Sequence, residues 1–190
     1  GNIVNTSGTT NNYGIQLSTS STSNVSGNVV RATGSGGNND VIRVVSSSSN
    51  NIITNNVLTT VGTPNSNYGI NLQGNSNIVI GNNITTGAGT ANNNHGIDVN
   101  GNSNNISDNI ISTSGSNGND WGITASGSSD NNITNNIIRT GLTGGAGNYG
   151  IQLTSTSLRN AVTGNTVNTS GTSTNYGIYL LSSSTSNVIT

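Results

Sequence analysis

The chain has 190 residues, a formal net charge of −1 and only four basic residues, so no electrostatic attraction to nucleic acid or to an anionic membrane is expected. It contains no cysteine, which excludes disulfide bonds and thiolate metal sites, and no apolar run approaches the roughly 18 residues that a membrane span requires. Charged residues make up 5% of the chain, and its excess of Asn, Ser, Thr and Gly is by itself typical of disorder.

Two columns of identical residues predict a folded repeat protein instead. One isoleucine and one asparagine each recur seven times at steps of 26 to 29 residues, and disordered sequence has no reason to keep such a register. The isoleucines are Ile15, Ile42, Ile70, Ile97, Ile123, Ile151 and Ile178. The asparagines are Asn2, Asn28, Asn56, Asn83, Asn109, Asn136 and Asn165.

Each repeat holds two short apolar segments separated by polar connectors. The first segment, with the pattern NYGIQL, lies at residues 12–17, 39–44, 67–72, 94–99, 120–125, 148–153 and 175–180. The second lies at residues 25–30, 53–58, 80–85, 106–111, 133–138 and 162–167, and an isoleucine or valine leads it. Because these segments are short and rich in β-branched residues, they predict strands rather than helices.

Strand alternation assigns the side chains of the first segment to two faces. Tyr13, Ile15 and Leu17 are predicted to share one face, and Gly14 and Gln16 the other. We therefore expect the isoleucine column to form the core ladder. An aromatic column is expected to stack at one corner of the coil: Tyr13, Tyr68, His95, Trp121, Tyr149 and Tyr176, interrupted by Asp40.

A coil of about 27 residues with short strands at its turns predicts an all-β fold, a parallel β-solenoid of seven coils that spans residues 1–190 as one domain. Equivalent strands then stack at about 4.8 Å, and identical residues form ladders along the axis. In such a stack each asparagine amide can donate to one neighbour and accept from the other. An unpaired buried amide would cost about 1–3 kcal/mol, so the column favours stacking.

The runs "YGI" followed by Ser/Asn-rich turns, and "NNITNNII" at 131–138, resemble the repeats of the pectate-lyase-like superfamily. The resemblance covers all seven coils and implies a right-handed parallel β-helix. That superfamily includes polysaccharide lyases, pectinases, mannuronan epimerases, periplasmic copper-maturation proteins and many surface proteins. The motif marks coils rather than active sites, so the resemblance implies the fold and leaves the activity open.

Five aspartates are the only acidic residues, which is few for a carboxylate pair or a calcium site. The most suggestive surface set is Arg43, Asn71 and Asp98, outward on three successive coils, although a solvated polar stripe is the preferred interpretation. His95 and Asp98 are three residues apart and are predicted to face opposite sides, which argues against a catalytic dyad. We expect no enzymatic activity, no cofactor and no metal; a polysaccharide lyase, epimerase or hydrolase is the alternative.

Ice binding by a flat threonine-rich face is a further alternative. Such a face needs a regular outward Thr-x-Thr ladder, and most coils lack the second threonine. The nearest column is Thr6, Ala32, Thr60, Thr113, Thr140 and Thr169.

The sequence begins and ends at the same position within the repeat. Thr190 followed by Gly1 would read NVIT-GNIV, which matches NAVT-GNTV at 160–167, and no polar cap is visible. Exposed edge strands invite pairing, either with further coils of the same chain or with head-to-tail copies. We therefore expect a structural fibre or sheath protein, extracellular or on the cell surface, whose main partner is itself. A carbohydrate-binding or polysaccharide-processing protein is the alternative.

Overall fold

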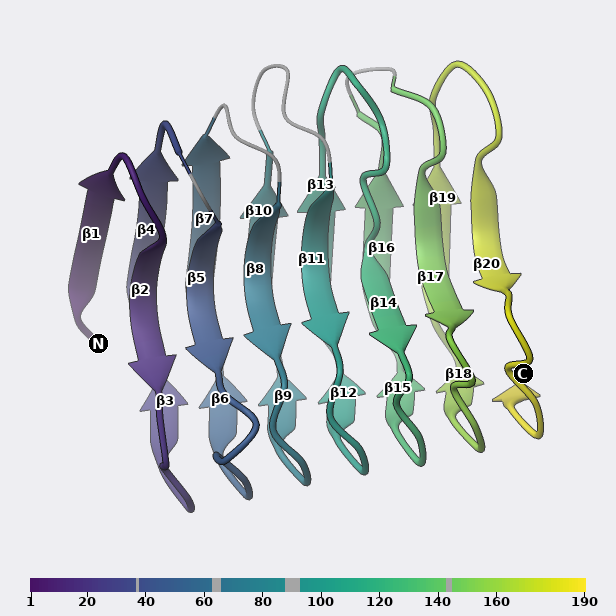
Figure 1. Cartoon of the computed structure of the whole chain (residues 1–190), viewed down its shortest axis with the longest axis horizontal. Coiled ribbons are helices and arrows are strands. Elements are labelled where there is room, and N and C mark those ends of the chain that lie inside the picture. The colour runs from purple at the N-terminus through teal and green to yellow at the C-terminus, as the bar shows by residue number, and fades with distance from the viewer. Residues whose placement is uncertain (37, 63–65, 88–92, 143–144) are drawn as a thin grey trace.

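The computed structural model describes residues 1–36, 38–62, 66–87, 93–142 and 145–190. The chain winds into seven coils, and each coil adds one strand to each of three parallel sheets (Figure 1). In Figure 1 the chain descends in the front layer, rises in the back layer and advances from left to right, so the solenoid is right-handed. The all-β class, the seven coils and the parallel stacking are thus confirmed. The described residues include no helix that could span a bilayer.

The three sheets are named here after their first strands. The β1 sheet contains β1 (Ile3–Gly8), β4 (Val29–Gly34), β7 (Val57–Gly62), β10 (Asn83–Thr86), β13 (Ile110–Thr113), β16 (Ile137–Thr140) and β19 (Thr166–Thr169). The β2 sheet contains β2 (Asn12–Leu17), β5 (Asn39–Val44), β8 (Asn67–Leu72), β11 (Asn94–Val99), β14 (Ile123–Ser126), β17 (Tyr149–Thr154) and β20 (Tyr176–Leu180). The β3 sheet contains β3 (Asn24–Ser26), β6 (Ile52–Thr54), β9 (Ile78–Ile80), β12 (Asn105–Ser107), β15 (Asn132–Thr134), β18 (Ala161–Thr163) and β21 (Val188–Ile189). In Figure 1 the β2 sheet forms the front layer, and the other two sheets form the back layer.

The isoleucine column is the centre of the hydrophobic core. Its five inner members have no exposed surface: Ile42, Ile70, Ile97, Ile123 and Ile151. Ile15 in the first coil is partly buried, and Ile178 in the last coil is 38% exposed because no described coil covers it. Each fully buried isoleucine contributes about 1.5–3 kcal/mol, so the ladder supplies a large share of the stabilising burial.

The backbone does not alternate regularly through the first segment of each coil. Tyr13 pairs with Asp40 and Ile15 pairs with Ile42, but the residue between them is skipped by the pairing on both strands. Neither strand carries an extra residue, and we call this shared irregularity the bulge. A Cβ atom on Gly14 would lie 2.4 Å from a methyl carbon of the core, so this glycine faces inward. The bulge turns the preceding aromatic position outward. The prediction that Tyr13 shares a face with Ile15, and Gly14 with Gln16, was therefore wrong.

The asparagine column forms a continuous hydrogen-bonded ladder. The backbone N–H and the side-chain amide of each member both donate to Oδ1 of the next, at 2.8–3.1 Å. Its members are Asn2, Asn28, Asn56, Asn82, Asn109, Asn136 and Asn165. Each coil thereby satisfies buried polar groups of its neighbour.

The fourth member of this ladder is Asn82, so the prediction of Asn83 was wrong. Asn83 is the exposed first residue of β10 and pairs with Val57 and Ile110. Three consecutive β-branched residues, Ile78–Ile80, hide the alternation in this coil, and a slip of one residue exchanges the two faces. A second signal gives the correct register. The residue before each inner ladder position has a positive φ, which Gly, Asn and Asp adopt most readily, and Gly81 precedes Asn82.

Two further ladders were not predicted. One precedes the strands of the β3 sheet and contains Asn51, Asn77, Asn104, Asn131, Asn160 and Asn187. The other lies at the start of the β2-sheet strands and contains Asn12, Asn39, Asn67, Asn94, Asp120, Asn148 and Asn175. Three corners of every inner coil are therefore held by stacked polar side chains.

Asp120 replaces an asparagine in the third ladder, and its carboxyl cannot donate when it is ionised. Its Oδ1 accepts from Asn94 at 2.8 Å, its backbone N–H donates to Asn148, and Oδ2 has no hydrogen-bond partner among the described residues. Burial raises the pKa of Asp120 to about 6, against hydrogen bonds from Asn94 that lower it. The folded state therefore favours the protonated form of this carboxyl.

We expect Asp120→Asn to stabilise the protein at alkaline pH. A carboxyl whose pKa is higher in the folded than in the unfolded state stabilises below the unfolded value, and this contribution is lost as the pH rises through about 6. The variant should raise the free energy of unfolding by about 1–2 kcal/mol at pH 8 and change it little near pH 4. Urea unfolding at both pH values checks this. A difference between variant and parent that does not change with pH would contradict it.

The threonine column considered for ice binding lies inside the solenoid. Its members Thr60, Thr113 and Thr140 have no exposed surface, and their hydroxyl oxygens have no partner among the described residues. A buried column cannot present a flat face to ice. These threonines therefore do not support ice binding.

Candidate functional site

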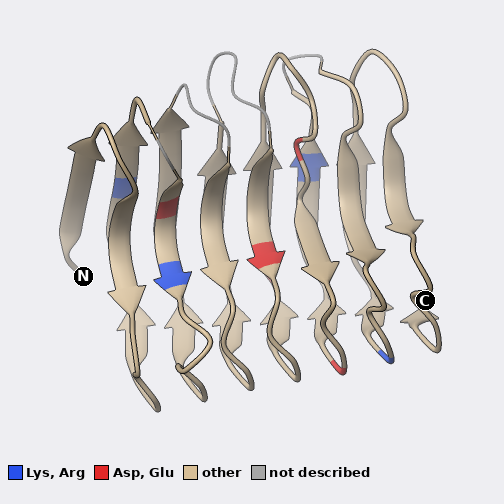
Figure 2. Cartoon of the chain, in the orientation of Figure 1, with Lys and Arg blue, Asp and Glu red and all other residues tan. Residues whose placement is uncertain are grey.

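The outer face of the β2 sheet carries a group of charged side chains near the middle of the front layer. Figure 2 shows one arginine and two aspartates there, on β5 and β11. The predicted set Arg43, Asn71 and Asp98 occupies directly paired positions on β5, β8 and β11. The structure therefore brings the predicted surface residues together on adjacent strands.

Asp40 is enclosed beneath this face and has no exposed surface. Its Oδ2 accepts a hydrogen bond from Asn71 at 3.1 Å, and its Oδ1 has no partner among the described residues. Burial raises the pKa of Asp40 to about 7, although the Asn71 hydrogen bond and the charge of Arg43 both lower it. Asp40 therefore carries little charge at mildly acidic pH and becomes ionised above neutral pH.

Arg43 fills the place that Asp40 leaves in the aromatic column. Its guanidinium lies over the ring of Tyr13, 4.8 Å from the ring centroid, and also donates a hydrogen bond to the Tyr13 hydroxyl. A planar cation on an aromatic face is a favourable replacement for a stacked ring. Arg43 therefore covers the face of Tyr13 that a ring at position 40 would otherwise meet.

The remaining rings form one continuous stack along the solenoid axis. Tyr68, His95, Trp121, Tyr149 and Tyr176 follow one another with centroids 4.4–5.7 Å apart and interplanar angles of 14–27°. The predicted aromatic stack is present, but it lies on the outer face of the β2 sheet. Because the rings cover each other's faces, they present mainly their edges to a ligand.

His95 and Asp98 lie on the same face, so the prediction that they face opposite sides was wrong. Nδ1 of His95 lies 3.4 Å from Oδ1 of Asp98, and the bulge at Gly96 places them together. The imidazole is 5% exposed, and neither ring nitrogen has a hydrogen-bond partner among the described residues. The geometry indicates a ring that is held in the stack rather than an accessible catalytic base.

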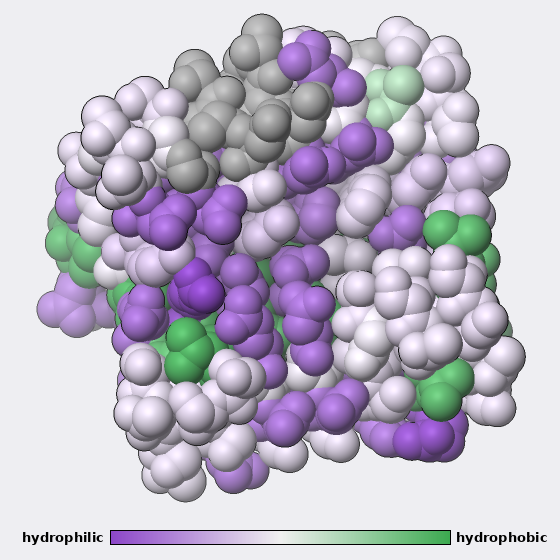
Figure 3. Space-filling model, in the orientation of Figure 1, coloured by the Kyte–Doolittle hydropathy of each residue, from purple (hydrophilic) through white to green (hydrophobic). Residues whose placement is uncertain are grey.

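The outward column beside the rings is polar in every coil. It consists of Gln16, Arg43, Asn71, Asp98, Thr124, Gln152 and Tyr179. Asn71, Thr124 and Gln152 are buried in its floor, and the Thr124 hydroxyl donates to Gln152 at 3.3 Å. Figure 3 shows hydrophilic side chains gathered across the middle of this face.

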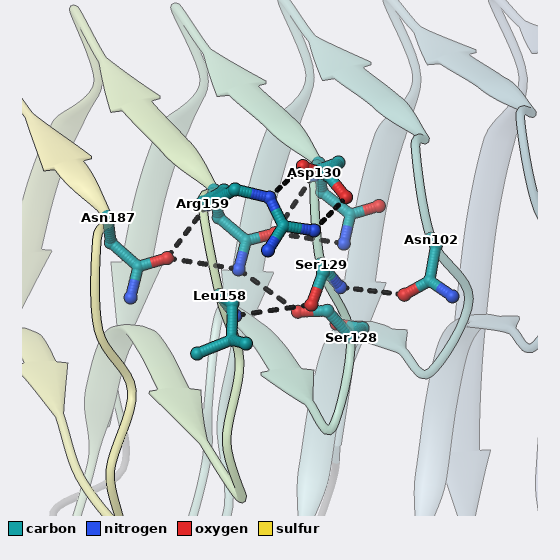
Figure 4. A network of polar contacts seen from close by, with 9 residues as sticks. Asn102, Ser128, Ser129, Asp130, Leu158, Arg159 and Asn187 are labelled. Carbon is teal, nitrogen blue, oxygen red and sulfur yellow. Dashed lines mark hydrogen bonds and ion pairs between the residues drawn. The ribbon is translucent and has the colours of Figure 1, made fainter.

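A second polar cluster, on the turns that lead into the β3 sheet, has a different character. Arg159 donates two hydrogen bonds to the carboxylate of Asp130, at 2.8 and 2.7 Å (Figure 4). The Arg159 guanidinium holds the pKa of Asp130 below its ordinary value. Both side chains are exposed, so this bidentate pair is a modest link between two coils.

The donor atoms of the front face do not fit a transition-metal centre. The chain has one histidine, no cysteine and no methionine, whereas copper and zinc prefer imidazole and sulfur ligands. His95 is enclosed by two rings, and the carboxylate of Asp98 lies beside it. Within the described ranges no group of three or more His, Cys, Asp or Glu residues could hold a metal ion.

Comparison with known proteins gives one family. No curated protein and no solved structure matches the chain. The model of the family described as "Periplasmic copper-binding protein (NosD)" matches residues 1–190. This match covers every coil and agrees with the parallel β-solenoid described above. The chain therefore belongs to the NosD family of periplasmic copper-binding proteins.

Proposed function

We propose that the polar outer face of the β2 sheet binds an extended polysaccharide without cleaving it. The observation that carries the proposal is the unbroken polar column, which offers an amide, guanidinium, carboxylate or hydroxyl group in every coil. These groups repeat at about 4.8 Å, which is comparable to the length of one sugar unit in an extended chain. A polymer of hydroxyl-bearing units would meet the exposed and partly exposed members of this column, among them Gln16 and Arg43 on the first two coils and Asp98 on the fourth.

Some side chains of this face are accessible to a ligand, and others are buried in its floor. Asn71, Thr124 and Gln152 are held by the surrounding side chains, whereas Arg43 and Asp98 remain partly exposed. Ring edges from the aromatic stack border the column and supply apolar contact. We propose contact through these exposed groups, with the floor holding them in position. Enclosure of Asp40 leaves Asp98 without an exposed acidic partner, which supports binding without turnover.

Copper is not part of this proposal, although the family description names it. With a single enclosed histidine and no sulfur ligands, the part of the chain that the structure describes offers no site suited to the metal. The periplasmic description of the family supports a location outside the cytoplasm, where polysaccharides of the cell envelope are found. We propose an envelope or extracellular location on this basis.

Binding to soluble polysaccharides tests the proposal. Isothermal titration with hexasaccharides of glucose, xylose, mannose and galacturonate should show saturable binding to at least one of them. Asp98→Ala should weaken that binding at least fivefold. Thr59→Ala, an outward change on the β1 sheet, should leave it unchanged. Absence of binding across the panel, or equal losses in both variants, would overturn the proposal, and release of shorter sugars would overturn the claim that the chain is not cleaved.

We also propose, as a second function, that the solenoid is extended end to end by further coils of the same polypeptide or of another copy. The supporting observation is the exposure of core-column residues in the last coil: Ile178 is 38% exposed, Leu180 40% and Ile189 42%. Covering these edges would bury apolar surface and pair the free strand edges. Electron microscopy of the full-length protein should show a rod longer than seven coils. A monomer with folded caps on both faces would contradict this.

A further inference from the structure

The four arginines of the chain stand in three different environments. Arg159 is paired with Asp130 through two hydrogen bonds. Arg31 and Arg139 are exposed on the outer face of the β1 sheet, where water solvates them. Arg43 is partly buried, and among the described residues no carboxylate lies within ion-pair distance of it.

The guanidinium of Arg43 has unused hydrogen-bonding capacity. A guanidinium offers five N–H donors, and the structure uses one of them for the Tyr13 hydroxyl. Its Nε is buried and has no hydrogen-bond partner within the described part of the chain. A partly buried charge without a counter-charge is costly, and its planar fork fits carboxylate and sulfate groups. The site therefore lacks an anion rather than a neutral partner.

Asp40 does not supply that anion at mildly acidic pH. Its carboxyl is directed to Asn71 through Oδ2, and burial raises its pKa to about 7. The charge of Arg43 therefore remains uncompensated in this range. On the neighbouring strand the exposed amide of Gln16 pairs in register with Arg43 and adds a neutral donor beside it.

We propose that Arg43, with Gln16 beside it, forms an oxyanion subsite that binds the carboxylate or sulfate of an acidic sugar unit. The inference rests on the proposed glycan-binding face and adds the class of its ligand. Stacking on Tyr13 fixes the plane of the guanidinium, so the subsite is organised before the ligand arrives. Acidic glycans should therefore be selected over neutral ones at this end of the face.

Paired oligosaccharides of equal length test the subsite at pH 5.5. A galacturonate hexamer or a sulfated galactose hexamer should bind at least tenfold more tightly than the neutral galactose hexamer in isothermal titration. Arg43→Gln should remove this preference, and Arg43→Lys should restore part of it. Arg159→Gln, a matched change at the paired arginine, should leave the preference intact. Equal affinity of the parent protein for acidic and neutral hexamers would overturn the subsite while leaving the glycan-binding function standing.

Titration with inorganic sulfate tests the anion subsite independently of the proposed glycan-binding function. If no hexamer binds, the proposed glycan-binding function fails, and sulfate alone then tests the subsite by chemical-shift changes at the Arg43 side chain. Saturable shifts that Arg43→Gln abolishes would support the subsite. Unchanged resonances would overturn it.

The pH dependence gives a second readout. The groups that face Asp40 are Arg43 on its own strand, Tyr13 on β2, Asn71 and Tyr68 on β8, and, at longer range, Asp98 on β11. When Asp40 ionises above about pH 7, its charge should pair with Arg43 and oppose a bound anion. The preference for acidic hexamers should therefore weaken between pH 5.5 and pH 8.5. Asp40→Asn should keep it constant, and a parallel decline in this variant would contradict the role of Asp40.

Discussion

Asn109→Leu is expected to lower the free energy of unfolding by at least about 3 kcal/mol. Asn109 accepts two hydrogen bonds from Asn82 and donates to Asn136 and to the carbonyl of Val79, all in the buried interior. Leucine would remove the acceptor of the Asn82 backbone N–H and the side-chain donor to the Val79 carbonyl, and each buried group left without a partner costs about 1–3 kcal/mol. Urea unfolding followed by circular dichroism measures the loss.

The control for this variant is Asn83→Leu. Asn83 lies next to the ladder in sequence but is exposed on the outer face of β10. The same substitution there should change stability by no more than about 0.5 kcal/mol. Equal losses in the two variants would show that stability depends on asparagine content rather than on the ladder register.

Gly96→Ala is expected to lower the free energy of unfolding by at least about 2–3 kcal/mol. A Cβ atom on Gly96 would lie 2.2 Å from Cγ2 of Ile111 and 2.6 Å from the carbonyl oxygen of Gly122. The second contact is backbone, so relief requires the strands of the β2 sheet to move apart. Thermal unfolding compared with the parent protein measures the effect.

Gly177 provides the matched control, because it holds the same position in the last coil. A Cβ atom there would meet nothing closer than a methyl group of Val167 at 4.0 Å. Gly177→Ala should therefore be tolerated, with a loss below about 1 kcal/mol. A well-tolerated Gly96→Ala would mean that the glycine column does not pack against the core.

The solenoid fold was predictable because the sequence repeat corresponds directly to the stacking of coils along one axis. Each coil contacts only its neighbours, so a period of about 27 residues in Ile and Asn directly states the stacking. The asparagine ladders that begin at Asn12 and Asn51 recur with the same period. They were missed because asparagine is so frequent in this chain that a periodic column does not stand out by itself.

The candidate site was predictable only in part. The common column of Arg43, Asn71 and Asp98 follows from strand register, which the repeat specifies. The contacts of His95 with Asp98 and of Asp40 with Asn71 depend on the bulge between the aromatic and isoleucine columns. Regular alternation, the rule available from sequence, gives the opposite face at that point. A bulge changes the pairing without leaving a composition signal beyond the glycine itself.

The fluorescence of Trp121 tests the central claim most directly. Trp121 is the only tryptophan of the chain and lies in the ring stack on the outer face of the β2 sheet. Titration with a hexasaccharide that binds in calorimetry should change its emission and saturate at the same concentration. Saturable calorimetric binding that leaves the emission unchanged, and that survives Asp98→Ala, would place the ligand elsewhere and contradict the account.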